Sequence, residues 1–374
     1  MKLKKYIYGV TLGVCSLTLT SCYNSENEFP DNEGGTTAYF AYQFPVRTLI
    51  LGNDIYDNTL ANDHKCRIWA TMGGAYKGRD AVADIVVDES LCDNLWFVDA
   101  GGNPSEPVRP MPKEYYNLLG NTIPYNGDSR GWVEVQFTDA FFNDPKAIEN
   151  TYVIPLLMTN VKGIDRILTG TPRVGLNPSR TNTADWVVLA MDYVLYCVKY
   201  KNPWDAKYIR RGVDKVTEND VTTTIVRKDF SLVNSDLEHY KENPVNQNDE
   251  VCGITTKNMT QAIFPVSFKT SGASVPCNLI LTVKGDQCTI STDDGNVTVT
   301  GSGEFIEKGT ERSEYKDYQW GNNNGQPVHR DILRLAYEVN FAEKGIQVST
   351  TDTLVVQTRE SNKKVFFSPK YVKP

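Results

Sequence analysis

The fold is decided by stretches such as Leu333-Arg334-Leu335-Ala336-Tyr337-Glu338-Val339-Asn340-Phe341, in which apolar and polar residues alternate. Successive side chains of a β-strand point to opposite faces, so this pattern predicts a strand with one buried face. The same period of two occurs in Trp132-Val133-Glu134-Val135-Gln136-Phe137 and in Cys277-Asn278-Leu279-Ile280-Leu281-Thr282-Val283. These segments are predicted to be half-buried antiparallel strands.

Clusters of Gly, Asn, Asp and Pro separate the predicted strands at short intervals. One of them, Asp293-Asp294-Gly295-Asn296, lies between two apolar segments and predicts a hairpin of residues 289–299. Helical periodicity is confined to Pro112–Leu119 and Ala140–Asn150, each long enough for about two turns. Short strands with such turns between them favour sandwiches or barrels of the all-β class.

The chain is long enough for two domains of ordinary size. The boundary is predicted at Lys201-Asn202-Pro203-Trp204, because Pro203 would end the strand predicted from the apolar run Trp186–Tyr200. We therefore expect one domain over residues 36–202 and a second over residues 203–374.

The first 21 residues have the features of a signal peptide. Lys2, Lys4 and Lys5 precede an apolar stretch, Ile7–Leu19, that is too short to span a bilayer comfortably. Leu19-Thr20-Ser21-Cys22 then resembles a bacterial lipobox, which implies that Cys22 carries the lipid and begins the mature chain. The alternative is an ordinary secretory signal followed by an unrelated cysteine.

Residues 22–35 are polar, acidic and poor in aliphatic side chains, which predicts a flexible tether. Removal of residues 1–21 takes three lysines and changes the net charge from −7 to −10. An acidic surface argues against nucleic acid and anionic membrane surfaces as partners. The expected location is the outer membrane, with the lipid as the only membrane contact and the protein facing the cell exterior.

Six cysteines remain in the predicted mature domains. No pair has CxxC spacing, so a zinc or redox site is not indicated. Disulfides are compatible with export, with Cys277 to Cys288 the most local choice, but free buried thiols are an equal alternative. The pairing stays open for Cys66, Cys92, Cys197, Cys252, Cys277 and Cys288.

Residues 36 to about 170 resemble the Ig-like N-terminal domain of unknown function found in carbohydrate-utilisation lipoproteins, including some with a family-18 endo-β-N-acetylglucosaminidase. The similar stretches are Ala83–Asp88, Tyr115–Leu119, Thr122–Pro124 and Thr151–Leu156. The segments Val198–Trp204 and Lys207–Gly212 resemble the junction to a β-rich, lipocalin-like domain. The resemblance implies an N-terminal Ig-like β-sandwich, a C-terminal antiparallel β-barrel, and a role in an outer-membrane glycan uptake system.

The sequence lacks the motifs of the enzyme classes considered. The family-18 pattern Asp-x-x-Asp-x-Asp-x-Glu and the GxSxG elbow are absent. His64, His239 and His329 lie far apart and lack a spacing that would place two on one helix face. Asp293 and Asp294 are explained by the hairpin turn. We therefore expect no catalytic residues, no metal and no cofactor.

A glycan-binding site combines aromatic platforms with amide and carboxylate side chains, because sugar rings have apolar CH faces flanked by hydroxyls. The best local candidate is the segment 315–326, in a predicted loop on a β scaffold. The alternative is that its aromatic side chains close one end of the barrel. The candidate ligand residues are Tyr315, Tyr318, Trp320, Asn322, Asn323, Asn324 and Gln326.

A second candidate lies at the predicted domain junction, where clefts often form, and consists of Asn202, Trp204, Asp205 and Tyr208. Packing between the domains is the alternative there. Trp96 and Trp132 are interpreted as core residues. Two classes of function remain: a non-catalytic surface lipoprotein that binds oligosaccharide, or a structural or adhesive module that binds a protein such as an importer subunit.

Overall fold

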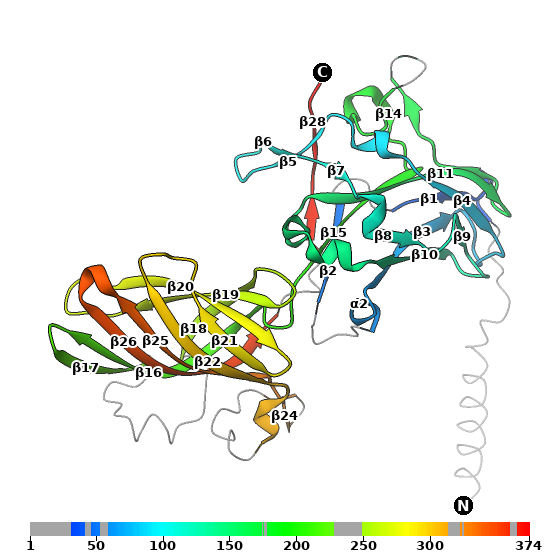
Figure 1. The fold of residues 1–374 in the computed structure, drawn as a ribbon. Helices are drawn as coiled ribbons and strands as arrows, with labels where there is room; N and C mark the ends of the chain where they lie inside the picture. Colours follow the sequence, from blue (N-terminus) through cyan, green and yellow to red (C-terminus); the bar gives the residue numbers. More distant parts are fainter. Residues whose placement is uncertain are drawn as a thin grey trace, which may run out of the picture.

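The protein is mostly β, as predicted, and consists of a two-sheet sandwich followed by a closed barrel (Figure 1). The computed structural model describes residues 31–41, 46–52, 59–173, 175, 178–227, 249–312, 322–323, 325–359 and 365–374. The helices in this part are short: α2 (Thr59–Asn62), α3 (Asp139–Asn143) and the single 3₁₀ turns η1 (Glu89–Cys92), η2 (Lys113–Tyr115), η3 (Pro145–Ile148), η4 (Thr183–Asp185), η5 (Gly309–Glu311) and η7 (Ala342–Lys344).

Two sheets form the N-terminal sandwich. The first, in spatial order, contains β12 (Arg166–Ile167), β1 (Thr37–Tyr39), β3 (Lys65–Gly73), β10 (Arg130–Phe137) and β8 (Tyr116–Leu118). The second contains β27 (Val365–Phe367), β2 (Val46–Leu51), β15 (Tyr193–Tyr200), β11 (Tyr152–Lys162), β4 (Val82–Val87) and β9 (Thr122–Pro124), with β7 (Arg109–Pro110) paired to β11.

Strict alternation in β3 and β10 decides which of their faces is buried. One face of each strand enters the sandwich core, and the other side chains point away from it. The core side of these two strands consists of Cys66, Ile68, Ala70, Met72, Val133, Val135 and Phe137.

Strands β11 and β15 are buried on both faces. On one side Ile154 and Val198 join the sandwich core. On the other side Val153 and Leu195 join a second apolar cluster that includes Trp186. The predicted strand over Trp186–Tyr200 is thus two strands, β14 (Trp186–Val188), which pairs with β13 (Thr171–Pro172), and β15.

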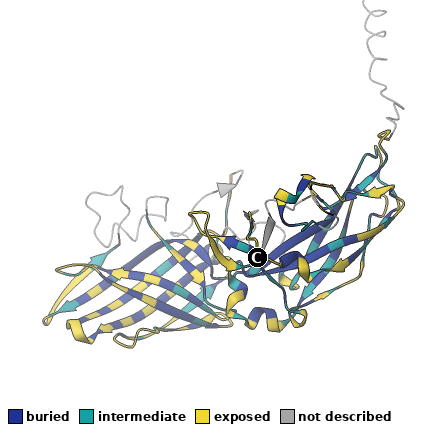
Figure 2. Cartoon of the chain, turned by 90° about the horizontal axis from the view of Figure 1, so that it is seen from above, coloured by how far each residue is buried: buried dark blue, intermediate teal, exposed yellow. Residues whose placement is uncertain are grey.

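The C-terminal half forms a closed antiparallel barrel, as predicted. Its strands are β16 (Ala206–Glu218), β18 (Glu250–Thr256), β19 (Gln261–Phe268), β20 (Val275–Lys284), β21 (Gln287–Ser291), β22 (Thr298–Ile306), β25 (Ile332–Phe341) and β26 (Ile346–Thr358). Pairing of β26 with β16 from Lys207 to Glu218 closes the ring. Alternating buried and exposed residues are visible along the barrel strands in Figure 2.

Strand β16 forks on its other edge. Residues 206–210 pair with β18, whereas residues 213–218 pair with β17 (Val221–Val226). The barrel wall therefore changes partner around Gly212. A Cβ atom at Gly212 would lie within 2.5 Å of Arg227 Nη1 and of the Thr351 carbonyl oxygen, so this position requires glycine.

Two arginines and two aspartates are buried together inside the barrel at this fork. Asp352 Oδ2 accepts hydrogen bonds from Arg210 Nη2 and Tyr337 OH, both at 2.8 Å, and Asp352 Oδ1 accepts one from Arg227 Nη1 at 2.9 Å. Arg227 Nη2 also donates to both carboxylate oxygens of Asp214, at 2.7 and 2.9 Å. Burial, followed by the Asp352 charge, raises the pKa of Tyr337 well above its usual value, so its hydroxyl stays protonated.

The chain returns to the sandwich after the barrel. Strand β27 pairs with β2, and β28 (Lys370–Tyr371) pairs with β5 (Leu95–Val98), which also pairs with β6 (Pro104–Pro107). Our predicted boundary assigned these last residues to the second domain. They lie with the first because edge strands β2 and β5 offer unpaired backbone groups to an additional strand.

Other local predictions have mixed outcomes. The hairpin across residues 289–299 is confirmed, since β21 pairs with β22 in register. The helical prediction for Pro112–Leu119 is wrong beyond the single turn η2, because strand β8 follows it, and Ala140–Asn150 contains only part of α3 and the 3₁₀ turn η3. All six cysteines are free, which decides between the two alternatives, and burial raises the pKa of the Cys92 and Cys252 thiols to about 12.

Removal of the Asp352 carboxylate should strongly destabilise the barrel. Asp352→Ala removes the buried carboxylate that Arg210 and Arg227 share and leaves them only the partly exposed Glu250 in common, so we expect a loss of about 3–5 kcal/mol in the free energy of unfolding. Urea unfolding of residues 23–374 measures it. Thr351→Ala, at the neighbouring exposed position, is the control and should cost about 0.5 kcal/mol or less. Equal small losses for both variants would contradict this account.

Candidate functional site

The outer face of the first sandwich sheet carries two tryptophans in direct cross-strand register. Trp69 of β3 lies opposite Trp132 of β10, and both point away from the core. Their ring centroids are 4.8 Å apart, with an interplanar angle of 46°. We call Arg67, Trp69, Arg130, Trp132 and Glu134 the tryptophan face. The two aromatic rings of this face are half-buried and belong to two regular strands, so the backbone holds them rigidly.

Charged side chains flank the ring pair on both sides. The Arg67 guanidinium lies 4.8 Å from the centroid of the Trp132 ring, and Arg130 lies 5.5 Å from that of Trp69. Arg67 also donates from Nε and Nη2 to Glu134 Oε1, at 3.1 and 2.8 Å. The surface thus combines aromatic rings with hydrogen-bond donors and a carboxylate, which suits a ligand with both apolar and polar faces.

The interpretation of Trp132 as a core residue is wrong, and the reason is strand parity. Val133, Val135 and Phe137 are the buried set of β10, so Trp132 faces outward. Trp96 is likewise only partly buried, between buried Leu95 and Phe97. The sequence signal that identifies the site is the Arg-x-Trp motif, which occurs at residues 67–69 and again at 130–132. The alternation of apolar residues in each strand indicates that both motifs face outward.

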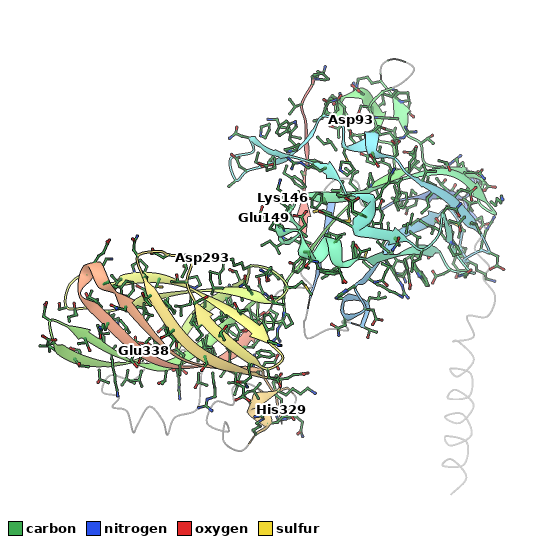
Figure 3. The ribbon with its side chains drawn as sticks, in the orientation of Figure 1. Asp93, Lys146, Glu149, Asp293, His329 and Glu338 are labelled. Atoms are coloured by element: carbon green, nitrogen blue, oxygen red, sulfur yellow. The ribbon has the colours of Figure 1, made fainter. Side chains whose placement is uncertain are left out.

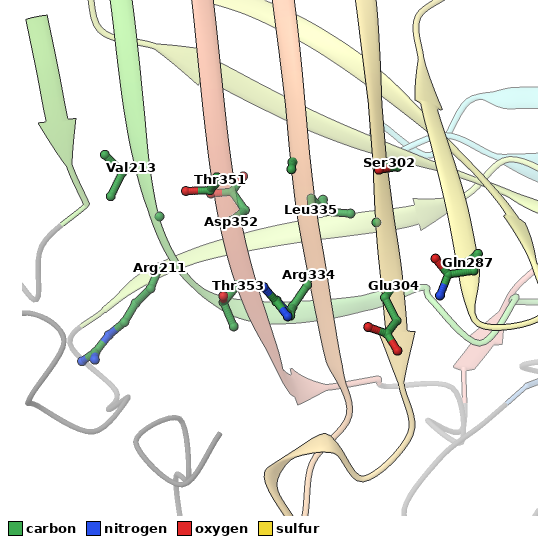
Figure 4. Close-up of a pocket in the computed structure, with 13 residues that line it drawn as sticks. Arg211, Val213, Gln287, Ser302, Glu304, Arg334, Leu335, Thr351, Asp352 and Thr353 are labelled. Carbon is green, nitrogen blue, oxygen red and sulfur yellow. The ribbon is translucent and has the colours of Figure 1, made fainter. Parts of the chain in front are cut away.

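A second surface, the barrel groove, lies on the outer wall of the barrel (Figure 4). It has a volume of about 540 Å³. Glu304, Arg334, Thr353 and Arg211 lie side by side across four strands, and the next row contains small residues that leave the hollow. The described lining residues include no aromatic ring, so the groove offers hydrogen bonds without a stacking surface.

Most of the predicted loop site lies outside the described residues, namely Tyr315, Tyr318, Trp320 and Asn324. Asn322 and Asn323 form the two-residue strand β23, which pairs with β24 (Gln326–Pro327). The Gln326 side chain is exposed. The lipidation prediction at Cys22 also falls outside the described part of the chain.

The junction residues Trp204 and Tyr208 are core residues of the barrel. Trp204 is 9% exposed and Tyr208 is fully buried, with its hydroxyl donating to the Trp204 carbonyl oxygen at 2.8 Å. The Trp204 ring contacts Phe305 edge-on, at a centroid distance of 6.5 Å. Both side chains pack within the barrel core rather than in a cleft or between the domains, and they offer no surface to a sugar.

His239 lies outside the described residues, and the described side chains considered for metal binding or catalysis are not brought together. Among the described residues, no group of three His, Cys, Asp or Glu side chains could hold a metal ion. Figure 3 shows Asp293 and His329 widely separated on the barrel. Asp293 pairs with Lys257, and the Asp294 carboxylate accepts the Asn296 N–H at 3.0 Å within the hairpin turn. In the described part, no helix is long and apolar enough to cross a membrane.

The geometry defines a class of protein with an all-β sandwich joined to an eight-stranded barrel. Residues 203–360 match a domain of unknown function (DUF5627), and residues 30–165 match a family of N-terminal domains. A protein of unknown function from Bacteroides ovatus is 37% identical and its crystal structure has a TM-score of 0.77, over 92% of this chain and 100% of that one. The chain belongs to the family of this Bacteroides ovatus protein.

A multidomain protein from Bacteroides ovatus that includes DUF1735 is a more distant match. It is 12% identical, with a TM-score of 0.39, over 86% of this chain and 94% of that one, and a likeness this weak carries no argument. No curated protein matches the chain.

The two tryptophans should stabilise each other without being essential for the fold. A double-mutant cycle of Trp69→Ala and Trp132→Ala should give a coupling energy of about 0.5–1.5 kcal/mol, because the rings are in contact across the strands. Urea unfolding of the four proteins measures it, and circular dichroism checks that each remains folded. Strict additivity of the two losses would show that the rings do not interact.

Proposed function

We propose that this protein is a non-catalytic, lipid-anchored cell-surface protein that binds glycans through the tryptophan face. The single observation that carries the proposal is the pair of contacting, mutually tilted rings of Trp69 and Trp132 on the outer face of a sheet. Aromatic rings pack against the apolar CH face of a sugar, while donors and acceptors beside them meet its hydroxyls. Arg67, Arg130 and Glu134 supply those polar groups.

Rigidity also favours this surface. The two rings sit on β3 and β10, which are hydrogen-bonded in register from Lys65 to Thr71, so little conformational entropy is lost when a ligand is bound. The barrel groove has polar side chains but no described aromatic ring. It is therefore the weaker candidate for a sugar.

The proposed anchor is the lipid on Cys22, within the lipobox-like Leu19-Thr20-Ser21-Cys22. Several acyl chains would hold the protein at the outer membrane, because each buried methylene contributes about 0.8 kcal/mol. The acidic tether of residues 22–35 would let the sandwich and barrel stand away from the membrane surface. In this role the protein captures oligosaccharide beside an outer-membrane importer.

One observation favours the alternative function, contact with a protein partner such as an importer subunit. Val187, Val188 and Leu189 are consecutive and are 62, 50 and 42% exposed. They follow one another at the end of the β13–β14 pair, and adjacent exposed aliphatic side chains are typical of protein contact sites.

A glycan array should separate the two functions. We expect residues 23–374 to retain at least one host or dietary glycan, and Trp132→Ala to weaken that binding at least about tenfold, or about 1.4 kcal/mol, through loss of the stacking surface. Trp96→Ala, at a partly buried tryptophan of strand β5, is the matched control and should bind normally.

Retention of no glycan, together with co-purification of an importer protein, would remove the proposal and favour the alternative. Normal binding by Trp132→Ala with loss in Trp320→Ala would move the site to the predicted loop without changing the class of function.

The anchor is tested separately in cells. The full chain should incorporate a clickable palmitate and fractionate with the outer membrane, whereas Cys22→Ser should be unlabelled, because the thiol that carries the lipid is gone. An unlabelled wild-type chain would refute the anchoring and leave the glycan-binding proposal untouched.

A further inference from the structure

The tryptophan face has a local two-fold symmetry that its charges break. Arg67-Ile68-Trp69 and Arg130-Gly131-Trp132 run antiparallel with the tryptophans opposite each other. Each arginine is therefore placed diagonally to the tryptophan of the other strand, and each lies over that ring. The register partner of Arg67 is Glu134, whereas the register partner of Arg130 is Thr71. One half of the face has its own carboxylate and the other half lacks one.

The two arginines therefore differ in exposure and in their ion-pair partners. Arg67 is 34% exposed and is held by two hydrogen bonds to Glu134. Arg130 is exposed, and no carboxylate of the described residues forms an ion pair with its guanidinium. The nearby Asp128 carboxylate instead accepts the Arg130 backbone N–H at 3.2 Å. Hydrogen bonds from the backbone of Ser129 and Arg130 lower the pKa of Asp128, and the charge of the nearby Arg130 guanidinium lowers it further without forming an ion pair.

The face is also positive on an acidic protein. The five residues of the face carry a net charge of +1, from Arg67 and Arg130 against Glu134, whereas the whole chain is −7. The adjoining Lys65 and Asp128 add one positive and one negative charge and leave this sum unchanged. The Arg130 guanidinium is the cation that can turn toward a ligand without breaking an ion pair. Guanidinium groups bind planar carboxylates through two parallel hydrogen bonds.

We propose that the tryptophan face selects acidic saccharides, in which a uronic acid ring stacks on the tryptophan pair and its carboxylate binds Arg130. This inference rests on the proposed glycan-binding function and adds the class of ligand. A uronate carboxylate is attached directly to the sugar ring, and the Arg130 guanidinium lies 5.5 Å from the Trp69 ring centroid. A ring on the aromatic pair therefore brings its carboxylate within reach of the guanidinium. Arg67 stays paired with Glu134 and holds the Trp132 ring in place.

The test compares a uronate with its own neutral ester. Calorimetry of residues 23–374 with trigalacturonate and with a hyaluronan tetrasaccharide, each as the free acid and as the methyl ester, keeps ring and linkage constant while it removes the charge. We expect at least one acid to bind about tenfold more tightly than its ester. Arg130→Gln should remove this difference while ester binding stays within about twofold, and Trp132→Ala should weaken both forms.

Lys65→Gln is the matched control, because it removes the same charge beside Glu134 without changing a residue of the tryptophan face. Equal loss of acid preference in Lys65→Gln and Arg130→Gln would overturn the assignment to Arg130. Equal affinity for the acid and the ester of both oligosaccharides would overturn the selectivity for acidic sugars. Binding of polyglutamate as tight as that of the acidic oligosaccharides would overturn it as well. These results leave glycan binding intact, whereas failure to bind any glycan of the array overturns the proposed function itself.

Discussion

Strand parity is the constraint on which the fold and the candidate site both depend. Because neighbouring side chains in a strand leave on opposite faces, burial of Val133, Val135 and Phe137 forces Trp132 and Glu134 outward. The same rule places Trp69 outward on β3, and the antiparallel register then brings the two rings together. The tryptophan face is thus a direct consequence of how the sandwich core is filled. A shift of one residue in either strand would bury the rings and expose the core.

The barrel depends on a second constraint, the fork of β16. Strand β16 pairs with β18 over its first residues and with β17 over its last ones, so backbone pairing changes between them. Buried ion pairs lie at this point of the barrel wall. Charges inside a barrel are costly unless they are paired, and Asp352 accepts hydrogen bonds from three donors with its two oxygens, while Arg210 Nε is left without a partner. Because Arg227 and Asp352 are 125 residues apart, the network also fixes the register between distant strands. We infer a structural role for these charges, since they face inward and away from solvent.

Much of the fold follows from the sequence, but little of the site does. Alternation in 333–341 and 277–283 predicts strands because each has one apolar set, and the turn at 293–296 predicts its hairpin through local residues alone. The interpretation of Trp132 as a core residue fails because aromatic residues suit either face of a strand, and only the alternation of the whole strand identifies the buried face. Its pairing with Trp69 depends on long-range register, which no local pattern contains. The burial of Trp204 and Tyr208 depends likewise on barrel closure.

The sign of the overall charge limits how an acidic glycan could be recognised. A chain with net charge −7 repels an anionic polymer at long range, so electrostatic steering would slow the encounter rather than assist it. Attraction must then come from contacts shorter than the Debye length of about 8 Å at physiological ionic strength. Within that distance the aromatic rings contribute regardless of charge, and Arg130 contributes only when an anion is placed beside the ring pair. Selectivity would therefore reside in a single contact, while affinity would depend on the two rings that strand parity has turned outward.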